Sequence, residues 1–199
     1  MKIACLDFEG VLVPEIWVNL AEQTQIDELT VTTRNIVDYD ELMRYRLDVM
    51  RKHGLGYKEL SAAAEGLAPL EGAGEFLDWL RQRYQVAIIS DTFYELARPL
   101  LQKLGNPMTL CHRLKVGDKG EIMDYHLRQK DPKRHSVKAF QSLKYEVVAA
   151  GDSYNDISML EQAEKGIFFK PAQKVIEDYP EYPIANDYAE LANMMAALI

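Results

Sequence analysis

Two carboxylates follow the first apolar stretch of the chain. Asp7 and Glu9 are separated by one residue and come directly after residues 3–6, which are apolar. Residues two apart just past a strand can point to the same side, so both carboxylates would lie over one spot. One can then act as a nucleophile and the other as an acid or base, provided that their environments differ. An acid pair that only faces water is the alternative.

Two further groups suit a bound anion. Ser90 and Asp91 follow the apolar residues 86–89 and precede a predicted helix, whose start favours negative charge. Lys133 lies in the first turn of another predicted helix, where a cation opposes the helix dipole unless an anion is close by. The alternatives are an ordinary helix cap at Ser90 and a solvated lysine at position 133.

The most specific polar stretch is residues 151–156. Asp152 and Asp156 flank a turn that opens a predicted helix, directly after the apolar residues 147–150. Carboxylate oxygens suit Mg²⁺, which keeps several waters and uses few protein ligands. This stretch therefore predicts a magnesium site, and a helix start rich in capping residues is the alternative.

These groups can act together only if the elements that carry them are neighbours. Predicted strands cover residues 3–6, 86–89, 109–114, 147–150 and 166–169. Predicted helices cover residues 71–84, 93–104, 132–143 and 155–163, and a last helix begins at residue 188. This alternation predicts an α/β fold with a Rossmann-like three-layer core, in which a mostly parallel sheet is covered on both faces. Ligands bind such sheets beyond the carboxyl ends of the strands.

Residues 14–68 break the alternation, because their pattern is helical throughout. Pro14 suits the first position of a helix, and residues 57–67 form a further one. We interpret the region as a small helical cap inserted after the first strand. The predicted domains are therefore a core of residues 1–13 and 69–199 and a cap of residues 14–68.

Arg46 stands out within this insertion. It lies four residues after Leu42 and four before Met50, on the apolar side of a helix that Asp38 or Asp40 can cap. Its guanidinium could clamp a carboxylate with two parallel hydrogen bonds. The alternative is a long stem that covers apolar surface while the charge reaches water.

Composition excludes several classes of protein. The chain has 199 residues, with 23 Lys and Arg against 31 Asp and Glu, which gives a net charge of −8. Nucleic-acid binding is not expected, because phosphate contacts need clustered Lys and Arg. No apolar run approaches the roughly 18 residues of a membrane span, and an acid at position 7 comes too early for a signal peptide. Cys5 and Cys111 form no disulfide framework, so a reduced cytoplasm is expected.

The order of acid pair, hydroxyl, lysine and acid cluster on successive strand ends resembles the haloacid dehalogenase superfamily of phosphohydrolases. The resemblance covers nearly the whole chain and implies a phosphorylated Asp7, with Glu9 protonating the leaving group. It implies that Ser90 and Lys133 bind phosphate oxygens, and that Mg²⁺ is held by Asp7, Asp152 and the backbone carbonyl of Glu9.

The helical insertion resembles the cap of the phosphoserine phosphatase branch of that superfamily. The match implies that Glu15 contacts the substrate and that Arg46 binds the substrate carboxylate. It also implies that Asn155 lies near the substrate and that the amide of Asp91 binds phosphate, while Asp156 has a supporting role.

Three stretches, residues 7–15, 90–95 and 128–134, are similar to the subgroup that also transfers phosphate from phosphoserine to homoserine. The resemblance implies L-phosphoserine and L-homoserine as substrates. Two departures from the wider family agree with it: Glu9 stands where a second Asp is usual, and Asp91 stands where phosphoserine phosphatases have Gly. Both departures also put simple hydrolysis by water in question.

Other functions stay open at this point. One is a capped phosphatase of the same superfamily that acts on another small phosphate ester. A phosphoaccepting signalling domain also uses a strand-end Asp, but such domains are shorter and lack an insertion after the first acid. A catalytically silent binding module is disfavoured, because every candidate catalytic group is present. A homodimer is compatible with the chain, since twofold symmetry is the commonest.

Overall fold

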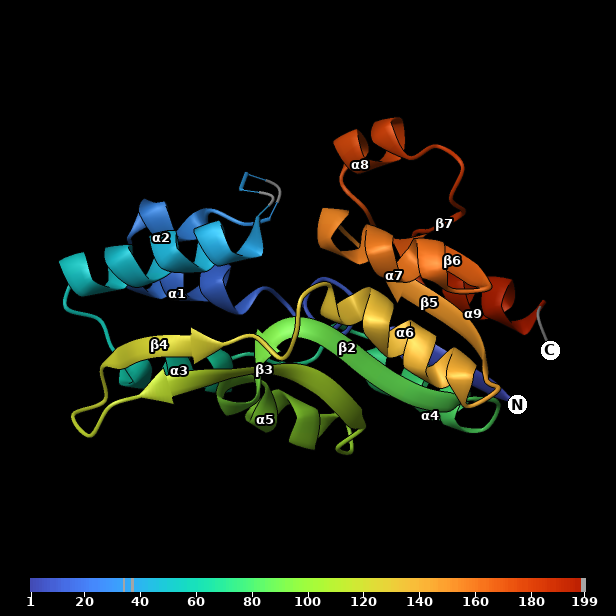
Figure 1. Ribbon diagram of the computed structural model, residues 1–199, viewed down its shortest axis with the longest axis horizontal. Helices are drawn as coiled ribbons and strands as arrows, with labels where there is room; N and C mark the ends of the chain where they lie inside the picture. Colours follow the sequence, from blue (N-terminus) through green and yellow to red (C-terminus); the bar gives the residue numbers. More distant parts are fainter. Residues whose placement is uncertain (34, 37, 198–199) are drawn as a thin grey trace.

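A twisted sheet forms the centre of the molecule (Figure 1). The computed structural model describes residues 1–33, 35–36 and 38–197. Within them the sheet has seven strands in the order β4-β3-β2-β1-β5-β6-β7, and all neighbours are parallel except β3 and β4. The strands are β1 (Lys2–Leu6), β2 (Gln85–Phe93), β3 (Met108–Val116), β4 (Ile122–His126), β5 (Glu146–Gly151), β6 (Lys165–Phe169) and β7 (Ile184–Ala185).

Helices cover both faces of the sheet. They are α1 (Ile16–Thr24), α2 (Tyr39–Lys52), α3 (Tyr57–Glu65), α4 (Ala73–Arg81), α5 (Tyr94–Lys103), α6 (Pro132–Ser142), α7 (Ile157–Gln162), α8 (Gln173–Asp178) and α9 (Tyr188–Ala196). Short 3-10 turns, η1 (Asp27–Thr30) and η2 (Tyr154–Asp156), complete the chain order. The predicted α/β fold with a mostly parallel sheet is confirmed.

Successive residues of β1 face opposite sides of the sheet, as a strand requires. Ala4 and Leu6 belong to one buried apolar cluster, which includes side chains of α4, α5 and α9. Ile3 and Cys5 belong to a second cluster with side chains of α6, α7 and α8. The sheet is therefore the middle of three layers, and each layer of helices buries its apolar face against it.

The three helices between β1 and α4 share the first cluster with the sheet. Trp17 of α1 and Leu60 of α3 are buried in the same cluster as Leu6. The expected helix start at Pro14 is wrong by two residues, because α1 begins at Ile16. Asp38 caps α2 as expected: its side chain accepts a hydrogen bond from the Glu41 amide.

The structure also corrects the expectations around β2 and the hairpin. The predicted strand end at residue 89 is wrong, because β2 continues through Ser90 to Phe93 and α5 begins one residue later. The strands β3 and β4 form an antiparallel pair, and the second of these was not predicted. None of the described helices combines the length and apolar character that crossing a membrane requires.

Candidate active site

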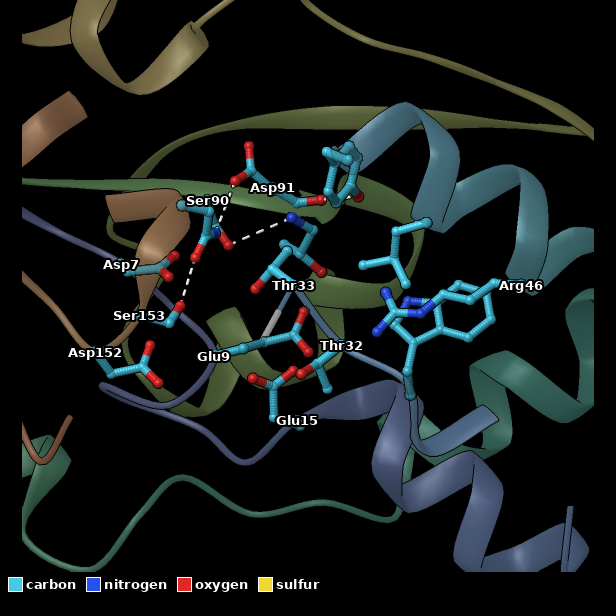
Figure 2. Close-up of a pocket in the computed structure, with 15 residues that line it drawn as sticks. Asp7, Glu9, Glu15, Thr32, Thr33, Arg46, Ser90, Asp91, Asp152 and Ser153 are labelled. Carbon is cyan, nitrogen blue, oxygen red and sulfur yellow. Dashed lines mark hydrogen bonds between the residues drawn. The ribbon is translucent and has the colours of Figure 1, made fainter. Parts of the chain in front are cut away.

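The strand ends bring the predicted groups together. Leu6 at the end of β1 lies beside Ile88 of β2 and Ala150 of β5, so the residues after them share one edge of the sheet. The Asp7 amide donates to the Ala150 carbonyl at 2.9 Å, which fixes Asp7 to its neighbour strand. The residues that follow these strands therefore surround one pocket (Figure 2).

Most predicted site residues line that pocket. Those that do are Asp7, Glu9, Glu15, Arg46, Ser90, Asp91, Asp152 and Asn155. The other two, Lys133 and Asp156, lie next to Asp7. The lining residues that were not predicted are Trp17, Thr32, Thr33, Tyr39, Leu42, Thr92 and Ser153.

Asp7 sits where the chain turns sharply away from the sheet. One of its carboxylate oxygens accepts from the Phe8 amide at 2.7 Å, and the other lies 3.0 Å from the ammonium of Lys133. Gly10 follows with φ +80°, and a Cβ built there would lie 2.5 Å from the Asp152 carboxyl carbon. Glycine is therefore needed at position 10 both for the turn and for the approach of Asp152.

Lys133 is 1% exposed and is surrounded by carboxylates. Its ammonium lies 2.5 Å from Asp156, 3.0 Å from Asp7 and 3.7 Å from Asp91. Burial alone would lower the pKa of Lys133, but the three carboxylates raise it well above its ordinary value. These anions explain why a lysine is stable in the first turn of α6, where the helix dipole opposes it. The alternative of a solvated lysine is wrong.

Asp156 organises the turn after β5. One of its oxygens accepts from the amides of Asp152 and Ser153, at 2.9 and 3.1 Å, and the other accepts from Lys133. The residue is fully buried. A Cβ at Gly151 would clash with the Asp156 carboxyl carbon, so this turn also depends on a glycine. Asp156 thereby sets the position of Asp152.

Three carboxylates form a cluster that could hold a metal ion. Oxygen atoms of Asp7, Asp152 and Asp156 lie within 4.8 Å of one another, and all three residues are buried. A set of oxygen donors of this kind fits Mg²⁺. Asp7 and Asp152 line the pocket, whereas Asp156 lies behind it, so the first two are the better candidates to hold a metal against a substrate.

Glu9 lies in the middle of the pocket. It accepts a hydrogen bond from the Ile16 amide at 2.8 Å. Burial raises the pKa of the Glu9 carboxyl, while the Ile16 amide and Thr92 act in the opposite direction. Glu9 therefore holds a proton to a higher pH than an ordinary glutamate does.

Arg46 enters the pocket from α2, on the far side from Asp7 (Figure 2). Its guanidinium lies 4.7 Å above the Trp17 ring and donates to the Val31 carbonyl at 2.9 Å. The Nε atom of Arg46 is buried without a hydrogen-bond partner among the described residues. The guanidinium is inside the protein, so the alternative in which its charge reaches water is wrong. Its Nε–H is left to donate to an anion.

Asp91 is held by several donors in the wall of the pocket. Its carboxylate accepts from Asn155 at 2.8 Å and lies 3.3 Å from Nε2 of His112. Burial alone would raise the pKa of Asp91, but the charge of Lys133 and the bonds from His112 and Asn155 lower it to about 2. The Tyr39 hydroxyl donates to the backbone carbonyl of Asp91. Asp91 is thus ionised and fixed in place.

His112 and Tyr39 were not predicted. A histidine within the predicted strand 109–114 was a signal for a buried polar contact, because a buried imidazole needs partners. Tyr39 gave no signal, since it directly follows a helix cap and no spacing of residues links it to the strand ends.

Comparisons with known proteins show the family and the fold of the chain. A family model described as haloacid dehalogenase-like hydrolase matches residues 1–164. The phosphoserine phosphatase ThrH of Pseudomonas aeruginosa is 54% identical over 191 residues, which cover 96% of this chain and 93% of that protein. A phosphoserine phosphatase of Pseudomonas syringae is 53% identical, over 96% of this chain and 81% of that protein. The fold is similar to a phospho-aspartyl intermediate analogue of phosphoserine phosphatase, with a TM-score of 0.81 and 23% identity, over 97% of this chain and 98% of that chain.

Proposed function

Because the chain belongs to the haloacid dehalogenase-like hydrolase family, we propose that it is a magnesium-dependent phosphoserine phosphatase. The pocket supports this proposal, because it offers different groups to the two ends of such a substrate. Asp7 and Ser90 lie at one end, next to the cation of Lys133, and Arg46 lies at the other. A phosphoserine would then place its phosphate against Asp7 and its carboxylate against Arg46, with Glu15 near its ammonium group.

Asp7 attacks phosphorus and forms an aspartyl phosphate, which splits one hard displacement into two easier ones. Lys133, the Ser90 hydroxyl and the Asp91 amide bind phosphate oxygens and stabilise the charge that develops on them. Glu9 protonates the serine oxygen as its bond to phosphorus breaks. It later takes a proton from the water or alcohol that attacks the aspartyl phosphate, which breaks the bond between phosphorus and Asp7 and frees its carboxylate.

Asp7, Asp152 and the backbone carbonyl of Glu9 would hold the magnesium ion. When bound, Mg²⁺ would neutralise negative charge on the phosphate oxygens. We propose that residues 14–68 act as a cap over the core, residues 1–13 and 69–199. A closed cap excludes water and brings Arg46 and Glu15 to the substrate.

We also propose that homoserine can accept the phosphate. Homoserine is serine with one more methylene, so Arg46 and Glu15 could hold either amino acid. Glu9 in place of the usual aspartate moves the acid outward by about one bond length, and Asp91 alters the wall next to it. An alcohol held in line gains an effective concentration of roughly 10⁵ M or more, which lets it compete with water.

The experiment that tests the function measures phosphate release from L-phosphoserine with Mg²⁺, with and without L-homoserine, while phosphohomoserine is followed by mass spectrometry. Loss of free phosphate with a matching gain of phosphohomoserine would establish the transferase. Equal phosphate release under both conditions would leave a phosphatase alone. If phosphoserine is not cleaved, a panel of other small phosphate esters is the next step, and the assigned roles of Arg46 and Glu15 are wrong.

Replacing Arg46 with methionine is expected to lower kcat/KM for phosphoserine about 10- to 100-fold, mainly through KM, because a charge-assisted pair with the carboxylate is lost. Methionine keeps much of the length of the side chain and removes the guanidinium that lies over the Trp17 ring. O-Phosphoethanolamine has no carboxylate and is the control: its kcat/KM should stay within about twofold, by the same reasoning. An equal loss with both esters would contradict the assignment.

Glu9→Gln is expected to lower kcat/KM for phosphoserine about 10²- to 10⁴-fold, the usual contribution of a general acid. In the wild type, kcat/KM should fall as pH rises through the pKa of Glu9, because ionised Glu9 has no proton to donate. Burial raises that pKa, so the fall should come at a higher pH than for an ordinary glutamate. The measurement is the pH dependence of kcat/KM.

p-Nitrophenyl phosphate is the matched control substrate for this variant, because nitrophenolate leaves without being protonated. The rate at which p-nitrophenyl phosphate forms the aspartyl phosphate should be little changed in Glu9→Gln. A comparable loss with both substrates would mean that Glu9 acts on the attacking groups and not on the leaving group.

A further inference from the structure

His112 lies behind the pocket, on β3, and is 2% exposed. Its Nδ1 accepts a hydrogen bond from the Arg128 amide at 3.1 Å. A backbone N–H can only donate, so Nδ1 carries a lone pair and the ring proton lies on Nε2. The carboxylate oxygen Oδ1 of Asp91 lies 3.3 Å from Nε2. The backbone thus sets which ring nitrogen is the donor.

The other oxygen of Asp91 faces the catalytic groups. Oδ2 accepts from the side-chain amide of Asn155 at 2.8 Å and lies 3.7 Å from the ammonium of Lys133. The Asp91 carboxylate therefore connects the ring of His112 to two residues at the phosphate end of the pocket. Without His112, Oδ1 of Asp91 would lack this partner, and the Asp91 carboxylate could rotate away from Lys133 and Asn155.

The ring itself is held in place by aromatic contacts. Its centroid is 5.6 Å from that of Tyr39 and 6.2 Å from that of Phe93. Tyr39 also donates from its hydroxyl to the backbone carbonyl of Asp91. Tyr39 belongs to the inserted helices and His112 to the sheet, so both parts of the chain fix Asp91.

We propose that His112 is a positioning residue for phosphoryl transfer: its Nε2–H orients the Asp91 carboxylate, which in turn holds Lys133 and Asn155 at the phosphate. The effect on phosphoryl transfer rests on the proposed function. The geometric part of the proposal, the Nε2–H form of the ring and the contact with Asp91, does not depend on the identity of the substrate.

Two substitutions of His112 distinguish the contact of Nε2 with Asp91 from the hydrogen bond that Nδ1 accepts. In His112→Gln the side-chain NH₂ can occupy the place of Nε2 and still donate to Asp91, whereas in His112→Asn the side-chain oxygen can replace only Nδ1. We expect His112→Asn to lower kcat for phosphoserine about 10- to 100-fold, as loss of an orienting hydrogen-bond partner does, with KM changed less than about threefold. His112→Gln should recover most of that loss. His126→Asn, at an exposed position on β4, is the control and should behave as the wild type.

A double-mutant cycle tests whether His112 acts through Asp91. Once Asp91→Asn has removed the carboxylate, His112→Asn should lower kcat further by less than about twofold, because the two changes break one path. Independent losses that multiply would overturn the proposal. So would equal losses in His112→Gln and His112→Asn with unchanged thermal unfolding.

The tautomer is measured without any substrate. Long-range ¹H–¹⁵N spectra of the imidazole rings, with the His112 signals identified by their loss in His112→Gln, should show a protonated Nε2 and an unprotonated Nδ1 at neutral pH. A ring protonated on Nδ1 would overturn the proposal. A wild-type protein that shows the expected tautomer but does not cleave phosphoserine would instead contradict the proposed function.

Discussion

Asp7→Asn is expected to abolish phosphate release from phosphoserine, with a loss of at least about 10⁴-fold in kcat, the scale on which removal of a nucleophile acts. An amide nitrogen does not form the aspartyl phosphate, and the other pocket-lining carboxylate beside Lys133, Asp91, lies farther from it, at 3.7 Å against 3.0 Å for Asp7. The measurement is phosphate release together with the retention of ³²P on the denatured protein. Wild type should retain the label and the variant should not.

The same variant should remain folded, which separates chemistry from stability. The asparagine oxygen can still accept from the Phe8 amide. Burial raises the pKa of the Asp7 carboxyl well above its ordinary value, and the Asp156 carboxylate adds to this against the opposing charge of Lys133. A carboxyl whose pKa is higher in the folded state than in the unfolded state costs stability as pH rises above the unfolded value of about 4.

Asp7→Asn should therefore gain stability relative to wild type as pH rises from about 4 to 7, in buffer with EDTA so that no metal offsets the charge. Urea unfolding at several pH values measures this. A variant that is less stable than wild type at every pH would mean that the Asp7 charge is needed for folding, and the activity loss would then have to be judged on the folded fraction alone.

The strand ends of the site could be predicted because the sequence changes character there. Apolar residues give way to Asp7 after β1 and to Asp152 after β5, and both strands end close to where the pattern indicates. The end of β2 could not be predicted this way. Ser90 and Thr92 are polar but buried, because hydrogen bonds satisfy their groups, so polarity does not mark the end of that strand.

The elements that the pattern missed are short or half exposed. β4 has one buried residue, Ile122, and its other side chains face water or are partly covered, so it lacks an apolar run. α8 has six residues and buries only Val175. Such elements are stabilised by pairing and packing with distant parts of the chain, which a local pattern does not contain.

The residues behind the pocket were not predictable for a related reason. His112 reaches Asp91 because Phe93 on β2 lies beside His112 on β3, across a register shift between Ile89 and Phe93. A one-residue change in that register would point His112 away from the site. By contrast, the placement of Lys133 next to Asp7 followed from a helix start at the edge where the strands end.

Lys133→Met is expected to impair both activity and folding. The ammonium lies among Asp156, Asp7 and Asp91, and the side chain is 1% exposed. Removing one partner of a buried charge cluster leaves the others uncompensated, which costs roughly 3–5 kcal/mol of unfolding free energy. Loss of a preorganised cation at the phosphate should lower kcat a further roughly 10²- to 10³-fold. Urea unfolding and phosphate release measure the two effects separately.

The stability loss should depend on pH with a definite sign. In Lys133→Met the carboxyl groups of Asp7 and Asp91 lose the cation that lowers their pKa values, so the pKa values of both in the folded state rise. Groups with raised pKa values destabilise the fold as pH increases, so the difference in unfolding free energy from wild type should be largest at neutral pH. It should shrink as pH falls toward about 4, where the carboxylates bind protons in both states.

A second substitution tests whether the stability loss in Lys133→Met comes from the lost charge or from the changed shape of the side chain. Asp156→Asn in the Lys133→Met background removes one of the uncompensated charges and should restore part of the stability, whereas activity should stay low because the cation at the phosphate is still missing. If Lys133→Met unfolds with the same free energy as wild type from pH 4 to 7, the lysine does not compensate these carboxylates. If the double variant recovers activity together with stability, Lys133 serves the fold alone and another group binds the phosphate.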